Sequence, residues 1–385
     1  MPGSAGVPTG EIHSLTGLRG AAAALVMLYH AMPVSDVDAV ERAFRHGYLT
    51  VDLFFVLSGF VIALSHAEIT GQAFTRAAYL RFLARRVARI YPLYIASTAL
   101  ALLLFATLHM RGFESQLWHQ PLVSAEIANA LMIQNWGLAG SFNGAAWSIS
   151  TEAMAYLLFP LLCVPAFRAP RRVRLAWAAA TVALLVLLSL YPDLPAWRDA
   201  APRLGPLDRT SHLSAASLLR CVAEFCLGMQ LCALHRAMPP WLDRHRGLAA
   251  VLALAAIVCL APVDGADWVI VLLYAPLIAG ACGPGPIRFV LSSTPLHRLG
   301  LCSYSFYMLH LFALDSRDAI AAALRHTGVT PTFPAVFCVA FGLAVALAWP
   351  TWRYVECPSS AAVRRLLASK PCANTRISTA AGRQA

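Results

Sequence analysis

The sequence predicts an all-α membrane protein, a polytopic helical bundle of about ten transmembrane helices with both termini in the cytoplasm. Three observations lead to this prediction. Hydrophobic residues make up 59% of the 385 residues and charged residues 13%, with a mean hydropathy of +0.63, well above that of soluble proteins. Apolar windows near 20 residues recur along the whole chain. Lys and Arg gather in alternate connecting segments.

The apolar windows define the predicted helices. Each window is long enough to cross a hydrocarbon core of about 30 Å as a helix. Because the first fourteen residues contain no basic stretch, we expect no cleaved signal, and the first span remains as an anchor. Residues 1–366 are predicted to form one transmembrane domain, and residues 367–385 a disordered cytoplasmic tail. The predicted spans are 15–34, 47–66, 90–109, 147–167, 173–190, 214–236, 247–263, 267–282, 294–314 and 333–353.

The basic residues between the spans predict the orientation. Loops 67–89, 168–174, 235–246 and 283–298 and the segment from Arg353 contain 20 Lys and Arg, whereas the opposite loops contain 8. The positive-inside rule therefore places both termini in the cytoplasm. The same bias accounts for most of the net charge of +11, so we do not expect nucleic-acid binding.

Two polar residues share one face of the first predicted span, "LRGAAAALVMLYH". Arg19 and His30 are eleven residues apart, about 20° past three full helical turns and roughly 16 Å along the axis. With the predicted orientation, Arg19 lies near the cytoplasmic end and His30 near the outer end.

Three further spans bring polar groups to the outer half of the membrane. Such groups are costly in hydrocarbon, so we expect them to face the bundle interior or a water-filled cavity. Asp52 and Glu152 have two interpretations, as capping or pairing groups or as parts of a site, and His310 is also compatible with a hydrogen-bonded core histidine. Glu224 is expected to pair with Arg220 or with another span. The groups at this depth are Asp52, Trp147, Ser148, Glu152, Ser303, Tyr304, Tyr307 and His310.

The arginines of "RAAYLRFLARRVARIYP" lie just inside the third span. They either set the topology and contact anionic lipids or hold a phosphorylated ligand from the cytoplasmic side. A histidine near the outer end suits a general base that deprotonates an alcohol. The ten cysteines and the histidines show no metal-ligand spacing, and there is no Gly-rich phosphate loop or G-x-S-x-G motif. This combination favours acyl transfer across the membrane.

The motifs themselves resemble the acyltransferase-3 family of integral membrane O-acyltransferases, from about Leu15 to Pro358. The resemblance rests on "LTGLRG" with Arg-x10-His, "VDLFFVLSGFVI", "RRVARIYPLY", "WSISTEAMAYLLFP", "EFCLGM", "LGLCSYSFYMLH" and "VECP", in the family's order. It implies a stand-alone form without a fused extracytoplasmic domain. Ala153 replaces the second acid of the family's W-S-x-S-x-E-E, and Cys357 stands where a basic residue is common.

The resemblance also implies roles for particular residues. His30 would be the catalytic base, and Arg19 would help to place the donor. Arg85, Arg86 and Arg89 match the acyl-CoA phosphate site, although the motif does not say which of the three contacts CoA. Apart from the resemblance, the expected mechanism needs groups that orient the imidazole and hold the oxyanion. Asp52 or Glu152 is expected to orient the imidazole of His30. The groups expected to bind the oxyanion or the acceptor are Ser148, Tyr304, Tyr307 and His310.

The sequence thus predicts an O-acyltransferase in the bacterial cytoplasmic membrane. We expect it to move an acyl group, most simply acetyl, from acyl-CoA to a hydroxyl of a surface or lipid-linked glycan, with no metal and no permanently bound cofactor. The alternative is a secondary transporter or a lipid-linked sugar flippase, which would also bury ionisable groups. Trp118, Trp136 and Trp197 are expected either to anchor at the interface or to stack on a sugar.

Overall fold

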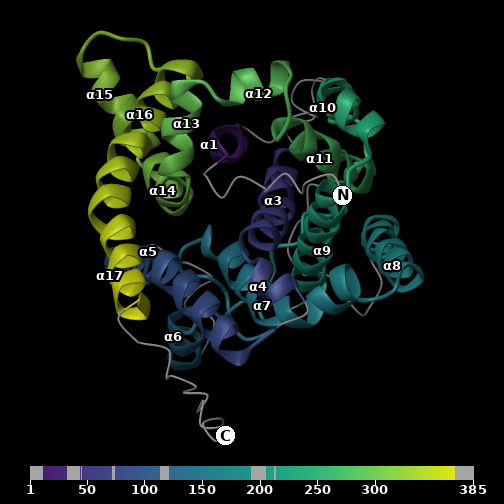
Figure 1. The fold of residues 1–385 in the computed structure, drawn as a ribbon. Coiled ribbons are helices and arrows are strands. Elements are labelled where there is room, and N and C mark those ends of the chain that lie inside the picture. The colour runs from purple at the N-terminus through teal and green to yellow at the C-terminus, as the bar shows by residue number, and fades with distance from the viewer. Residues whose placement is uncertain are drawn as a thin grey trace, which may run out of the picture.

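Helices account for all the regular secondary structure in the described part of the chain. The structure is a computed structural model, and it describes residues 12–32, 44, 46–71, 74–112, 121–191, 205–211 and 214–368 (Figure 1). Six helical segments in this part are long and apolar enough to cross a membrane. The prediction of an all-α membrane bundle is therefore confirmed, while the total of ten crossings and the cytoplasmic position of the termini remain predictions.

The helices follow one another in a simple order. In the first half of the chain they are α1 (His13–Ala31), η1 (His46–Leu49), α3 (Thr50–Ser65), α4 (Ala67–Thr70), α5 (Arg76–Met110), α6 (Leu122–Ala130), α7 (Ala146–Cys163), the π-helical turn η3 (Val164–Arg168) and α8 (Arg171–Leu190). In the second half they are α9 (Ala216–Arg236), α10 (Pro240–Leu260), α11 (Asp267–Ala281), α12 (Pro286–Leu291), α13 (Thr294–Leu301), α14 (Ser303–Asp315), α15 (Arg317–His326), α16 (Phe333–Thr351), the π-helical turn η5 (Trp352–Glu356) and α17 (Cys357–Ala368).

Each predicted span overlaps one or two of these helices. The main differences are at the third, ninth and tenth spans, and α10 begins at Pro240, before the predicted start at 247. The ninth span, 294–314, is divided at Cys302 between α13 and α14. The tenth continues through η5 into α17, which ends at Ala368, so residues 369–385 of the expected tail lie outside the described residues. The third span begins much earlier than predicted.

The early start of α5 changes how the arginines are held. The helix is 35 residues long and begins at Arg76, so most of the expected loop 67–89 is helical. Its first turns consist largely of Ala, Leu and Arg, which are strong helix formers. The Thr75 side chain accepts a hydrogen bond from the Ala78 N–H at 3.1 Å and caps the helix. The hydropathy pattern missed these turns because their arginines lower the apolar average.

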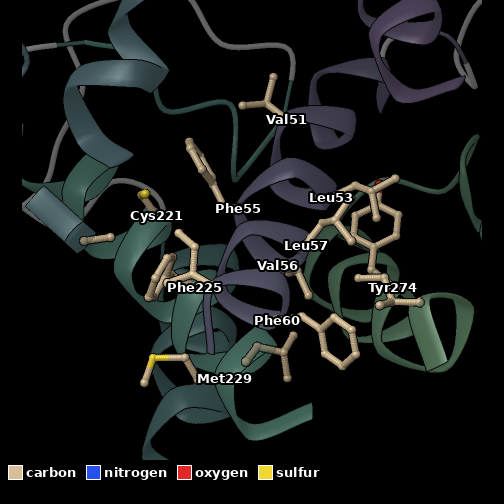
Figure 2. Close-up of a cluster of buried hydrophobic side chains, with 14 of the residues drawn as sticks. Val51, Leu53, Phe55, Val56, Leu57, Phe60, Cys221, Phe225, Met229 and Tyr274 are labelled. Atoms are coloured by element: carbon tan, nitrogen blue, oxygen red, sulfur yellow. The ribbon is translucent and has the colours of Figure 1, made fainter. Parts of the chain in front are cut away.

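Two glycines let α3 and α9 approach each other closely near the middle of the bundle. A Cβ atom on Gly59 would lie 2.0 Å from the carbonyl oxygen of Phe225, and one on Gly228 would lie 1.9 Å from that of Val56. Figure 2 shows α3, which carries Val56 and Phe60, next to α9, which carries Phe225 and Met229. In a membrane, close van der Waals packing over small residues is a main source of helix association. Either glycine therefore sets the separation of the two helices.

A second close contact fixes α1 against α13. A Cβ atom on Gly300 would lie 1.9 Å from the carbonyl oxygen of Thr16, and one on Gly20 would lie 2.4 Å from that of Leu296. Helix α1 also packs against α14. The polar face of α1 is thereby held in a fixed position relative to the polar residues of α14.

Candidate active site

Five helices surround a cavity in the middle of the bundle, and seven of the predicted site residues line it. The cavity contains about 860 Å³ of empty space, part of it open to solvent. Its apolar lining comes largely from α3. The predicted site residues that line it are Arg19 from α1, Arg86 and Arg89 from α5, Ser148 and Glu152 from α7, and Tyr304 and Tyr307 from α14.

Three arginines give one part of this cavity a positive charge. Arg86 and Arg89 are three residues apart on α5 and so share a face of the helix, whereas Arg85 is not among the lining residues. Among the described residues, Arg19, Arg86 and Arg89 have neither a hydrogen bond nor a salt bridge, and Nε of Arg86 is buried. Buried donors normally have acceptors. The arrangement therefore fits an anionic ligand, and Arg86 and Arg89 are the arginines of the expected motif that face it.

Two carboxylates moderate this charge. Glu152 acts electrostatically on Arg19 and on Arg86, and Glu356 acts on Arg19. Glu356 is 5% exposed and accepts a short hydrogen bond from the Ser305 hydroxyl. Glu152 therefore faces the arginines, and its expected role of orienting His30 has no contact in the structure to support it. Glu356 was not predicted as a site residue, although it is the acid of the "VECP" motif.

Hydroxyl groups line another part of the cavity. The hydroxyls of Ser148 and Tyr307 are 2.8 Å apart and bridge α7 and α14. The Tyr304 hydroxyl donates to the carbonyl oxygen of Ile90 at 2.8 Å. The Ser148 hydroxyl also donates to the carbonyl oxygen of Ala145 at 3.2 Å, so Tyr307 donates within the pair. Tyr307 is therefore the hydroxyl that can turn from Ser148 to a developing oxyanion, whereas those of Ser148 and Tyr304 already donate to backbone carbonyls.

The two histidines lie together beyond this hydroxyl pair. The ring centroids of His30 and His310 are 5.1 Å apart, and those of His310 and Tyr307 are 5.6 Å apart. His30 is exposed and does not line the central cavity, while His310 is 1% exposed. His310 thus stands between His30 and the Tyr307–Ser148 pair at the cavity wall.

Backbone carbonyls determine which ring nitrogen of each histidine is basic. Nδ1 of His30 is 2.9 Å from the carbonyl oxygen of Val26, and Nδ1 of His310 is 2.6 Å from that of Tyr307. Because a carbonyl only accepts, we assign the proton of each neutral ring to Nδ1, which leaves the Nε2 lone pair free. The Val26 carbonyl therefore orients the imidazole of His30, which is the role that was expected of Asp52 or Glu152.

Asp52 has a different partner from the one expected. Its carboxylate accepts from Nε of Arg220 at 2.7 Å and, in a second short contact, from Nη2. Glu224 lies 3.6 Å from Nε of the same arginine, which confirms the expected pairing of Glu224 with Arg220. All three side chains are fully buried. Asp52 therefore joins α3 to α9, and the acid that acts electrostatically on His30 is Asp208, which the sequence did not single out.

One of the three tryptophans considered for sugar binding is held inside the fold. Nε1 of Trp136 donates to the carbonyl oxygen of Ser150 at 2.8 Å. Its indole N–H is therefore occupied by the backbone of α7. Trp118 and Trp197 lie outside the described residues.

The chain is similar to known acyltransferases. Residues 12–353 match the family described as "Acyltransferase domain" (Acyl_transf_3). The chain is 30% identical to "Acyltransferase MdmB" of Streptomyces mycarofaciens over 322 residues, which cover 79% of each protein. It is 27% identical to "Putative peptidoglycan O-acetyltransferase YrhL" of Bacillus subtilis over 323 residues, 78% of this chain and 48% of that protein. No solved structure matches the chain significantly.

Proposed function

Because this chain belongs to the acyltransferase-3 family of membrane O-acyltransferases, we propose that its donor is acyl-CoA from the cytoplasm and its acceptor a hydroxyl of a surface or lipid-linked glycan. The observation that carries the proposal is the central cavity. It joins three unpaired arginines to a hydroxyl pair that lies next to two histidines. We place the protein in the bacterial cytoplasmic membrane, with the arginines toward the cytoplasm.

The arginines bind the donor in this proposal. Guanidinium groups make strong, directional hydrogen bonds to phosphate oxygens. With the phosphates of CoA on Arg19, Arg86 and Arg89, the pantetheine arm extends through the cavity toward Ser148 and Tyr307. Glu152, beside Arg19 and Arg86, keeps these side chains in place and lowers the net charge of the site.

The histidine and the hydroxyl pair carry out the transfer. Nε2 of His30 accepts the proton of the acceptor hydroxyl, and the acceptor oxygen forms a bond with the thioester carbonyl carbon. The oxyanion accepts a hydrogen bond from Tyr307, which turns its hydroxyl away from Ser148. The C–S bond then breaks, and CoA leaves as a thiol after the imidazolium returns the proton to sulfur. Because His310 and Tyr307 stand between His30 and the cavity, transfer requires this contact to open, so that His30 and the acceptor reach a thioester beside Tyr307.

Transfer of label from acyl-CoA tests the proposal. Inside-out membrane vesicles containing the protein are incubated with acetyl-CoA labelled in the acetyl group, and base-labile label on glycan is measured. We expect labelled ester only when the donor is on the cytoplasmic side, and none with His30→Ala. Movement of sugar or lipid-linked sugar without ester formation would contradict the proposal and favour a transporter or flippase.

A further inference from the structure

A second cavity lies beside the central one, on the other side of α5 and α7. It contains about 610 Å³ of empty space, part of it open to solvent. Its walls come from α5, α7 and the segment 131–136. The lining is mostly apolar and includes Leu83, Ile90, Met132, Ile133, Ala153 and Leu157.

The two cavities share a wall. Arg86, Ile90, Ile149 and Tyr156 line both of them. Helical periodicity explains how α7 serves both sides, since residues four apart lie on one face. Ser148 and Glu152 face the central cavity, whereas Ala153 faces the second one. The wall between the two cavities is thus formed by these four shared residues, one of which, Ile149, directly follows Ser148 in the chain.

The small side chain of Ala153 leaves space on the α7 side of the second cavity. Its methyl group is the smallest side chain of the α7 wall, next to Ile149, Tyr156 and Leu157. A longer residue at this position would extend into the second cavity, while the neighbouring Glu152 would still face the arginines. Position 153 can therefore change the volume of the second cavity without a direct change in the central one.

We propose that the second cavity holds the acyl chain of the donor, so that the protein accepts chains longer than acetyl and Ala153 limits their length. This inference rests on the proposed function. An alkyl chain is the part of an acyl-CoA that suits an apolar cavity, and each methylene buried there adds a factor of about four in affinity. The shared wall places this cavity beside the site assigned to the thioester. Bilayer lipid is the competing source of an alkyl chain, because Val87, Leu131 and Leu157 are exposed at the rim.

Binding measurements test the proposal without knowledge of the acceptor. The full chain in lipid nanodiscs is titrated with CoA, acetyl-CoA, butyryl-CoA and hexanoyl-CoA. We expect affinity to rise about tenfold or more from acetyl to butyryl in the wild type. Ala153→Leu should remove this gain and leave the affinity for CoA and acetyl-CoA within about threefold. Ala179→Leu, the same change at an exposed position of α8 that lines neither cavity, is the matched control.

A second variant covers the case in which Ala153→Leu does not fold. Leu157→Trp narrows the same cavity from its exposed rim and should act in the same direction. Equal affinity for all chain lengths would overturn the acyl-chain pocket, and so would a rise in affinity with chain length that both variants leave intact. In either case, binding of CoA itself would still support the proposed function. The cavity would instead be assigned to lipid if native mass spectra showed a lipid adduct on the wild type that both variants lose, while acyl chain length had no effect on affinity. Absence of any CoA binding would refute the proposed function itself.

Discussion

The centroids of the imidazole rings of His30 and His310 lie 5.1 Å apart, where the C-terminal end of α1 packs beside α14. His310 is buried and contacts Tyr307, whose hydroxyl reaches Ser148 at the wall of the central cavity. The exposed histidine is thus connected to the cavity through one buried neighbour. This relationship leads to the first prediction.

His30→Ala should abolish transfer while leaving the protein folded. A general base contributes about 10²- to 10⁴-fold to a rate, and in the proposed mechanism Nε2 of His30 accepts the proton of the acceptor hydroxyl. The measurement is the initial rate of ester formation in membranes with matched amounts of protein. His30→Ala should bind CoA as well as the wild type does, because its side chain does not line the cavity. Transfer within about tenfold of the wild-type rate would rule out His30 as the base.

The arginines of α5 should differ in their effect on CoA binding. Arg86→Ala and Arg89→Ala each remove a guanidinium that lines the cavity. Charged hydrogen bonds contribute about 1.5–3 kcal/mol, so each change should weaken CoA binding by about 10- to 100-fold. Arg85→Ala is the matched control on the same helix, and it should weaken binding less than about threefold. Equal losses for all three variants in a CoA titration would show that net charge, and not the lining position, controls binding.

Tyr307→Phe should lower kcat more than Tyr304→Phe. Tyr307 shares its hydroxyl with Ser148, whereas the hydroxyl of Tyr304 already donates to the Ile90 carbonyl. Removal of an oxyanion donor costs about 10²- to 10³-fold in kcat. Steady-state kinetics with acetyl-CoA should therefore show this loss for Tyr307→Phe with a nearly unchanged KM. A larger loss for Tyr304→Phe would mean that the oxyanion lies elsewhere in the cavity.

Arg220→Met should destabilise the protein strongly. Loss of one partner of a buried ion pair costs about 3–5 kcal/mol, and Arg220 is the partner of both Asp52 and Glu224. Thermal unfolding in detergent should show a lower midpoint for this variant. The double variant Arg220→Met with Asp52→Leu removes an unpaired charge and should recover part of the loss. A double variant less stable than Arg220→Met would contradict a mainly electrostatic role for the pair.

The helices could be predicted from the sequence because the membrane demands long apolar stretches. The start of α5 could not, since its first turns contain the arginines that lower hydropathy. Their helical conformation nevertheless follows from helix propensity and the Thr75 cap. The i,i+3 spacing of Arg86 and Arg89 also indicated a common face, although not which face met the cavity.

The partners of the buried acids were harder to predict. Asp52 and Arg220 are 168 residues apart in the chain, and only the packing of α3 against α9 brings them together. The link between His30 and His310 likewise depends on how α1 and α14 pack. Asp208 gave no signal because it lies in a connecting segment outside every apolar window. Sequence patterns predicted a depth in the membrane for the residues inside the spans. The pairing of Asp52 with Arg220 and of His30 with His310 could be found only from the tertiary structure.

The most direct test of the central cavity is a cryo-EM structure of the full chain in nanodiscs with a thioether analogue of acetyl-CoA, which cannot transfer its acyl group. We expect phosphate density against Arg19, Arg86 and Arg89, with the acyl carbonyl beside Tyr307 and Ser148 and accessible to His30. Analogue density outside this cavity, or a carbonyl that His30 cannot approach, would contradict the proposed mechanism.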